Sequence, residues 1–294
     1  MLASTPQFPF AKLSLTPQPF GLRVKCVLDA ELIKTKSHIT GTAIEATGGM
    51  ANYFGLGAFS KGMVKELGRS LGEFLGKLDK QGGTTVIYWG TNDEKSIQNL
   101  GFRSGSEWGY FQFGKPIAGF GKKCELMPAL RYFLEEGHLS VRPSLRGQAE
   151  GIFIFLLDGG IDDFPFVLDY LGQFVGDVVG ERRKRAHLVF VGMGENFIEE
   201  SRGQLHALAA LSNRANPPVI SSLVVRDVSL LVDMVKDSVM EFMQVSKQGA
   251  VLNSNNQPIQ SFPDGVPGAF QFYIPVGSKS FMLNLDGNLY TQVI

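Results

Sequence analysis

Strand-like and helix-like patterns alternate through the middle of this chain. Residues 64–78 carry apolar side chains every three or four positions, which predicts an amphipathic helix with Ser60 as its N-cap. Residues 151–157 are apolar without interruption, as in a parallel strand that is buried on both faces. Further strands are expected at 22–28, 38–45, 84–89, 187–191 and 219–225, and further helices at 126–136, at 163–175, from near Glu195, and at 227–245. This alternation predicts an α/β fold in which a mainly parallel central sheet has helices on both faces.

The two ends of the chain have a different pattern. Residues 1–20 are rich in Pro, Ser, Thr and Gln, which predicts an extended N-terminal arm. After residue 247, polar and glycine-rich sequence leads to three strand-like runs without a helix, at 269–274, 280–285 and 290–294. We therefore expect an arm at 1–20, a Rossmann-like domain at 21–247 and a small C-terminal β extension at 248–294. The pattern leaves open whether the last strands pair within the chain or add to the sheet of a neighbouring protein.

Charge and composition narrow the class of protein. Lys plus Arg and Asp plus Glu both total 28, so no overall basic field favours nucleic acid, and near-neutrality favours association with other proteins or with itself. The N-terminus lacks a basic segment followed by an apolar run, and no apolar stretch approaches the length of a membrane helix. Two distant cysteines, Cys26 and Cys124, favour free thiols and a reducing, cytoplasmic location, although one disulfide is the alternative.

Candidate chemistry follows the strand ends, because ligands of open parallel sheets bind beyond the carboxyl ends of the strands. Four segments there are arranged as in von Willebrand factor A-type (vWA) domains. They are Ile44–Met50, Lys122–Leu130, Phe153–Asp163 and Val189–Phe197. Over roughly residues 20–246 the chain resembles the copine-like and tellurium-resistance-associated branch of that family. The resemblance implies a Rossmann-like vWA fold and a function in protein binding.

The same resemblance implies a metal site, and the residues depart from it. The family holds a divalent cation, usually Mg²⁺, with carboxylates and hydroxyls. Here Glu45 stands for the first Asp, Thr47 keeps a hydroxyl and Asp158 is retained, whereas Gly49 and Cys124 replace two oxygen ligands. Because Mg²⁺ requires a nearly complete set of hard oxygen ligands, we predict a degenerate, unoccupied site and no cofactor, with weak Mg²⁺ binding as the alternative.

Lys122 and Lys123 lie in the second of these segments and have two possible roles. An ammonium group could take the place of the cation and pair with Glu45 and Asp158, since two buried carboxylates need a counter-charge. Alternatively, both lysines are solvated and Asp158 caps the turn that follows it. Both lysines are candidates for an interaction surface.

Three glycines on one line of the first helix form a second candidate surface. Each glycine weakens a helix by about 1 kcal/mol relative to alanine, so the line indicates a close backbone approach. The neighbour is either the sheet or a partner protein. These glycines are Gly68, Gly72 and Gly76.

No catalytic residues are predicted. The chain has no phosphate-binding GxxxxGK[ST] loop and no GxSxG nucleophile motif, and a dinucleotide loop at Gly192-x-Gly194 lacks its third glycine. Asp158, Asp162 and Asp163 are interpreted as loop and cap residues, with a catalytic acidic cluster as the alternative. The basic run Glu181–Arg185 is interpreted as a solvated loop, with binding to an acidic partner or nucleic acid as the alternative. We expect a non-enzymatic protein-interaction module or a structural subunit of an assembly. The alternatives are a small-molecule or nucleotide-binding enzyme with its site at the same sheet end, and a Mg²⁺-dependent adhesion module.

Overall fold

The structure, a computed structural model, describes residues 5–33, 38–55, 62–93, 96–135, 150–194, 197–215, 217–225 and 227–294. The chain divides into two compact units. One comprises residues 36–235, and the other combines residues 1–35 with residues 236–294. Within the described residues, no helix combines the length and apolarity needed to cross a bilayer.

The unit of residues 36–235 is built on one six-stranded sheet with the order β5-β4-β3-β6-β7-β8. All neighbouring pairs are parallel except β4 and β5, which are antiparallel. The strands are β3 (His38–Glu45), β4 (Gly83–Trp89), β5 (Ile97–Ser104), β6 (Glu150–Leu157), β7 (Ala186–Met193) and β8 (Ile220–Val225). Each residue of β3, β4 and β7 is buried, and so is each residue of β6 after Glu150, which explains the continuous apolar run at 151–157.

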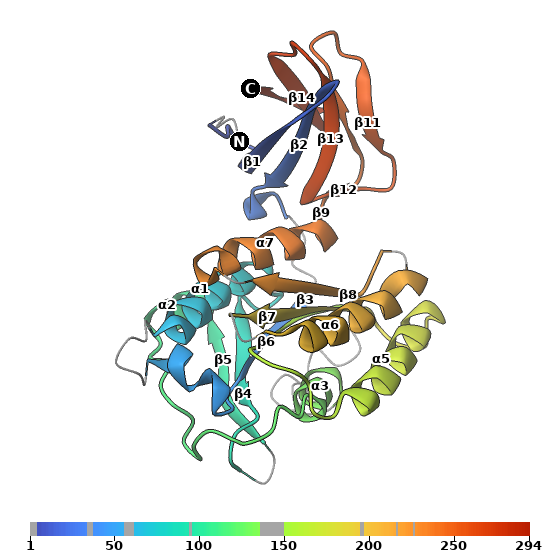
Figure 1. The fold of residues 1–294 in the computed structure, drawn as a ribbon. Helices are drawn as coiled ribbons and strands as arrows, with labels where there is room; N and C mark the ends of the chain where they lie inside the picture. The colour runs from blue at the N-terminus through green and yellow to red at the C-terminus, as the bar shows by residue number, and fades with distance from the viewer. Residues whose placement is uncertain are drawn as a thin grey trace. The chain divides into compact units, whose positions relative to one another are not determined.

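Helices cover both faces of this sheet (Figure 1). Phe155 of β6 and Phe190 of β7 point into the core on the face that carries α3, α5 and α6, and α1 packs on β3 and β4 from the other face. The helices of the unit are α1 (Met63–Leu78), α2 (Gly105–Tyr110), α3 (Met127–Leu134), α5 (Phe164–Val179) and α6 (Glu199–Leu211), with 3-10 turns η2 (Gly49–Phe54), η4 (Ser212–Arg214) and η5 (Val228–Leu230). Helix α7 (Leu231–Phe242) continues into the second unit.

The line of glycines on α1 faces another helix of the same unit. A Cβ added at Gly68 would lie 2.4 Å from Cζ of Phe113, and one at Gly72 would lie 2.6 Å from Cβ of Trp108. At Gly76 the nearest atoms belong to the backbone of Gly105, the first residue of α2. The close approach predicted from the sequence is therefore present, and α2 with its following segment occupies the face that was a candidate for a partner protein.

The second unit is a β-sandwich made from both ends of the chain. A three-stranded antiparallel sheet has the order β1-β2-β13, and a four-stranded antiparallel sheet has the order β11-β10-β14-β15. The rings of Phe272 in β13 and Phe281 in β14 lie 4.9 Å apart, and Phe10 in β1 also contacts Phe281. The elements are β1 (Phe10–Gln18), β2 (Gly21–Leu28), η1 (Ala30–Leu32), β9 (Gln244–Ser246), β10 (Gly249–Leu252), β11 (Pro258–Phe262), β12 (Val266–Pro267), β13 (Ala269–Pro275), β14 (Ser280–Leu285) and β15 (Asn288–Val293).

The predicted fold class is wrong for this chain. We expected one Rossmann-like vWA domain with a small C-terminal β extension. Among the residues that the structure describes, only one sheet is mainly parallel and the other three are antiparallel. The expected arm contains β1, and the strand at 22–28, which was assigned to the parallel sheet, is β2 of the sandwich. The physical reason is pairing: β2 bonds to β1 on one side and to β13, almost 250 residues later, on the other.

Individual elements follow the sequence pattern closely. Strand β3 has the predicted bounds, and β6, β8 and β14 begin and end within one residue of their predictions. Helix α7 is shorter than the expected 227–245, because η5 precedes it and β9 follows it. The predicted cap at Ser60 and the predicted helix start near Glu195 lie outside the described residues.

Candidate functional site

The carboxyl ends of β3 and β6 bring the sequence-predicted acidic residues together. The two strands are parallel neighbours, with Ile44 opposite Leu156. Glu45 is the last residue of β3 and Asp158 is the first residue after β6, so both lie at the same end of the sheet. Both side chains are buried, with exposed fractions of 1% and 6%. Thr47 lies beside them and is also buried. This group, Glu45 with Thr47, Cys124 and Asp158, is called the acid cluster below.

Glu45 is bonded on both carboxylate oxygens by groups of its own chain. The Thr47 hydroxyl donates to Oε1 at 2.6 Å, and the backbone N–H of Asp158 donates to Oε2 at 3.0 Å. The Cys124 thiol also bonds this carboxyl group. Burial, followed by the charge of Asp158, raises the pKa of Glu45 to about 7, while these hydrogen bonds act in the opposite direction. Glu45 therefore titrates near neutrality.

Cys124 and Gly49 complete the surroundings of the two carboxyl groups. Burial, with the nearby Glu45 as a second cause, raises the pKa of the Cys124 thiol, so it stays protonated and acts as a donor. Burial also raises the pKa of Asp158. A Cβ added at Gly49 would lie 2.8 Å from Oδ2 of Asp158. Glycine therefore leaves room for the carboxylate at the position where the vWA pattern has a serine hydroxyl.

The two aspartates after Asp158 hold the neighbouring loop. The carboxylate of Asp162 accepts the Cys124 N–H at 2.7 Å, and the Asp162 N–H returns a bond to the Cys124 carbonyl. Asp163 accepts the N–H groups of Leu126 and Met127, at 2.8 and 2.9 Å, where α3 begins. These donors have no partner within the helix. The interpretation of both aspartates as loop and cap residues is confirmed.

The two lysines of this loop lie outside the acid cluster. Lys122 is exposed, and Lys123 has an exposed side-chain fraction of 73% and pairs with Glu125 at 3.3 Å. The carboxylate oxygens of Glu45 accept bonds from Thr47 and from the Asp158 backbone, not from either ammonium group. Of the two roles weighed for these lysines, the solvated one agrees with the structure.

The side chains present do not fit a magnesium ion. Both oxygens of Glu45 already accept hydrogen bonds, Gly49 supplies no ligand, and the thiol of Cys124 is a soft donor that a hard cation avoids. Across the described residues, no group of three or more His, Cys, Asp or Glu side chains is placed to hold a metal ion.

The amino end of the sheet holds a second polar group that sequence reasoning missed. His38 of β3 lies 3.7 Å from Glu150 of β6, and His187 follows on β7. Burial is the main cause that lowers the pKa of His187 to about 4. The strand order β3-β6-β7 brings these three residues together, and no local sequence pattern indicates it.

The sequence matches no family model, and no curated protein matches it. Among solved structures, the chain is similar to the pilus adhesin SpaC from Lactobacillus rhamnosus GG. The open conformation has 8% identity over 96% of this chain and 40% of that chain, with a TM-score of 0.48. A second SpaC structure has 7% identity over 96% and 47%, with a TM-score of 0.45. Proximal thread matrix protein 1 from the mussel byssus has 10% identity over 74% and 49%, with a TM-score of 0.43.

This chain thus spans less than half the length of each of these proteins. At these identities and TM-scores, the similarity supports no conclusion about fold or function. The resemblance to vWA domains and the cytoplasmic location both stay predictions from the sequence.

Proposed function

We propose that this chain is a non-enzymatic protein-interaction module, or a subunit of an assembly, that contacts its partner at the carboxyl end of the six-stranded sheet. One observation carries the proposal. The carboxylates of Glu45, Asp162 and Asp163 at this sheet end accept hydrogen bonds from the chain itself, whereas Lys122 and Lys123 beside Cys124 are exposed. The part of this sheet end that another molecule can contact is therefore the exposed surface around Lys122 and Lys123.

The composition of that surface supports protein recognition. Phe166, in the first turn of α5, has an exposed fraction of 73%. Helix α5 begins directly after Asp163, whose carboxylate accepts hydrogen bonds from the N–H groups of Leu126 and Met127. These bonds join the start of α5 to the segment that carries Lys122 and Lys123, which is called the lysine loop below. Aromatic side chains beside a charged rim are typical of the energetically important parts of protein interfaces.

Charge reversal at the loop tests the proposal. A Lys122→Glu/Lys123→Glu variant and a Phe166→Ser variant should each recover less of the partner when the tagged full chain is captured from cells that naturally produce it. The matched control is Lys77→Glu/Lys80→Glu, two exposed lysines where α1 ends at the opposite end of the sheet. Unfolding curves of all variants should match the wild type, since these side chains are exposed.

The recovered proteins are quantified by mass spectrometry against untagged cells. We expect at least one partner whose yield falls in the Lys122→Glu/Lys123→Glu variant and in the Phe166→Ser variant, but not in the control. Light scattering of the purified chain separates self-association from binding to a different protein. If every recovered protein survives the loop variants, or if the control loses it equally, this sheet end is not the contact surface.

A further inference from the structure

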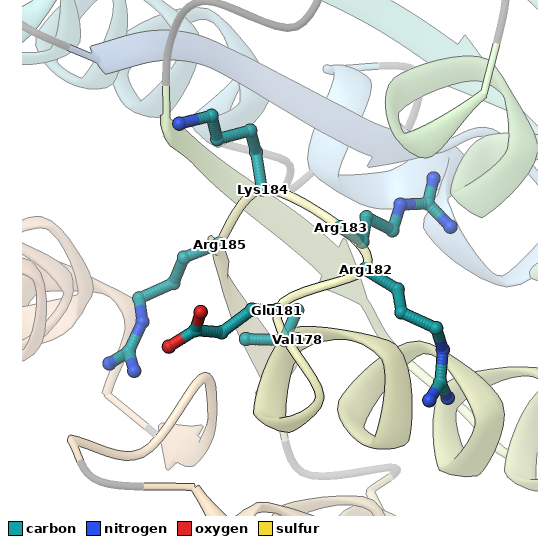
Figure 2. Close-up of a pocket in the computed structure, with 6 residues that line it drawn as sticks. All are labelled: Val178, Glu181, Arg182, Arg183, Lys184 and Arg185. Atoms are coloured by element: carbon teal, nitrogen blue, oxygen red, sulfur yellow. The ribbon is translucent and has the colours of Figure 1, made fainter.

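A dense group of basic side chains lies at the other end of the same sheet. Four consecutive cations, Arg182, Arg183, Lys184 and Arg185, form the loop between α5 and β7. With Val178 and Glu181 they line a surface hollow of about 460 Å³ (Figure 2). This segment, Glu181–Arg185, is called the basic loop below.

Part of this charge has a structural role. Arg182 donates from Nε and Nη2 to one oxygen of Asp177, at 2.9 and 2.7 Å. Arg183 donates to the carbonyl oxygen of Leu134 and lies over the ring of Phe174, 5.2 Å from its centre. Cations at this position also favour the carboxyl end of α5, where the helix dipole is negative. These contacts explain why two arginines follow the helix.

Lys184 adds charge that these contacts do not explain. Lys184 is exposed and has no ion pair within the described part of the chain. Arg185 donates to the carbonyl oxygen of Pro217 at 2.9 Å, and its charge is one of the causes that lower the pKa of Glu150. Two further exposed arginines, Arg131 of α3 and Arg214 of η4, each precede by three residues the carbonyl group that Arg183 or Arg185 contacts.

The directions of the side chains indicate the kind of partner. Figure 2 shows the cationic ends spreading to different sides of the basic loop, with Lys184 pointing away from Arg182 and Arg183. A single small anion would need convergent donors, whereas several separated carboxylates can each meet one cation. We propose that the basic loop binds an acidic segment of a protein, rich in Asp and Glu.

Two observations favour an acidic protein over nucleic acid. The lining of the hollow contains no aromatic side chain on which a base could stack, and Phe174 beneath Arg183 is buried. Glu181 lies among the four cations. Its negative charge would repel the evenly spaced phosphates of a nucleic acid, whereas the carboxylates of an acidic protein segment can be spaced so that none lies next to it. This surface is separate from the lysine loop at the carboxyl end of the sheet, so the two proposals stand or fall independently.

A labelled oligo-glutamate peptide and the full-length chain test the inference by fluorescence anisotropy. Wild type should bind at low ionic strength and more weakly at physiological ionic strength, because salt screens exposed charges. Lys184→Glu should weaken binding about fivefold and Lys184→Ala by less, as expected for one exposed charge. The control Lys122→Glu/Lys123→Glu should bind like the wild type, whatever it does to partner capture.

Three results would overturn the inference. They are absence of peptide binding at low ionic strength, equal affinity of Lys184→Glu and wild type, and tighter binding of a single-stranded oligonucleotide with the same number of charges. The last result would replace the acidic protein by nucleic acid. Lys184 is exposed, and its side chain makes no hydrogen bond or ion pair within the described residues. Its substitution should therefore leave the fold intact, which a thermal unfolding curve verifies.

Discussion

Glu45 has an environment that suits the protonated acid. Its carboxyl group is buried next to that of Asp158, and a buried like-charge pair disfavours ionisation of both groups. When protonated, Glu45 can donate to the Thr47 hydroxyl and still accept the Asp158 N–H at its other oxygen. The cluster therefore needs neither a metal ion nor a lysine to compensate its charge at mildly acid pH.

The first prediction concerns the pH dependence of stability. The pKa of Glu45 is raised from its usual 4.5 to about 7, so the folded chain holds this proton more tightly than the unfolded chain. The contribution of Glu45 is complete below pH 4.5 and is lost as the pH rises to about 7, by roughly 2–4 kcal/mol. Glu45→Gln imitates the protonated acid, so it should lose little over this range.

The measurement is urea unfolding of both proteins between pH 5 and 8. The difference between the two curves isolates Glu45, because His187 contributes equally to both. With a lowered pKa of about 4, His187 changes stability in the opposite direction, raising it as the pH increases. A difference that does not change with pH would show that Glu45 is ionised throughout.

Asp163 provides the second prediction. Asp163→Ala leaves the N–H groups of Leu126 and Met127 without their acceptor, which should cost about 1–3 kcal/mol of unfolding free energy. The matched control is Asp169→Ala on the exposed side of α5, whose carboxylate accepts a hydrogen bond from the Gln173 side chain. The control should change stability by less than about 0.5 kcal/mol. Equal effects in both variants would contradict the capping role.

Among the elements, α1 and α2 are the pair in which spacing determines packing. Glycine every fourth residue gives α1 a flat strip, and Trp108 of α2 fits against it. The indole N–H of Trp108 donates to the Thr84 carbonyl at 3.0 Å, which fixes the ring in place. The steric clash of an added methyl group on this strip therefore cannot be relieved by a movement of the Trp108 side chain.

The third prediction compares the same substitution in two helices. Gly72→Ala places Cβ 2.6 Å from the Trp108 side chain and should destabilise the protein by about 1–3 kcal/mol. Gly172→Ala in α5 meets no atom within 4 Å and should stabilise by up to about 1 kcal/mol, the helix preference of alanine over glycine. Opposite signs in chemical denaturation check the assignment. Stabilisation by both would mean that α2 does not lie on the strip.

Elements were more predictable from the sequence than their partners. Burial on both faces leaves an apolar run that can be recognised directly in the sequence, as in β6. Pairing between β2 and β13 leaves no local signal, because the two strands are far apart in the chain and each alternates like any half-buried strand. Prolines at positions 6, 9, 17 and 19 made the first segment look like an arm, although Leu13 and Leu15 lie inside a strand.

At the scale of the whole molecule, both chain ends are needed for one β-sandwich. Strand β2 is the central strand of its sheet, and Val24 and Cys26 on it are completely buried. A substitution between β2 and β13 should therefore open this unit without direct effect on the sheet of residues 36–235. Gly21 lies at that contact, where an added Cβ would meet the Ile274 carbonyl oxygen.

The fourth prediction uses the two free cysteines as reporters. Gly21→Ala in the full-length chain should speed the labelling of Cys26 by a maleimide about tenfold or more, because local opening exposes the thiol. Cys124, buried in the other unit, should label at the wild-type rate and serves as the internal control. Peptide mapping by mass spectrometry separates the two sites. Parallel acceleration at both cysteines would mean that the chain opens as one unit.

The sequence predicted which strand ends form the candidate site, but not the directions of the side chains around it. Carboxyl ends of neighbouring parallel strands always meet at one edge, so the proximity of Glu45 and Asp158 followed once β3 and β6 were assigned. The outward direction of Lys122 and Lys123 did not follow. It depends on Asp162, which holds the backbone of Cys124 and so sets the orientation of the whole loop.

Glu45 of the acid cluster accepts hydrogen bonds from its own chain on both oxygens, so we expect the cluster to be closed to a cation. Calorimetric titration of the full-length protein with Mg²⁺ and then Mn²⁺, at pH 8 where Glu45 is mostly ionised, tests this directly. We predict no saturable heat and no rise in unfolding temperature at millimolar metal. Saturable binding of one ion, lost in Asp158→Asn, would contradict the account.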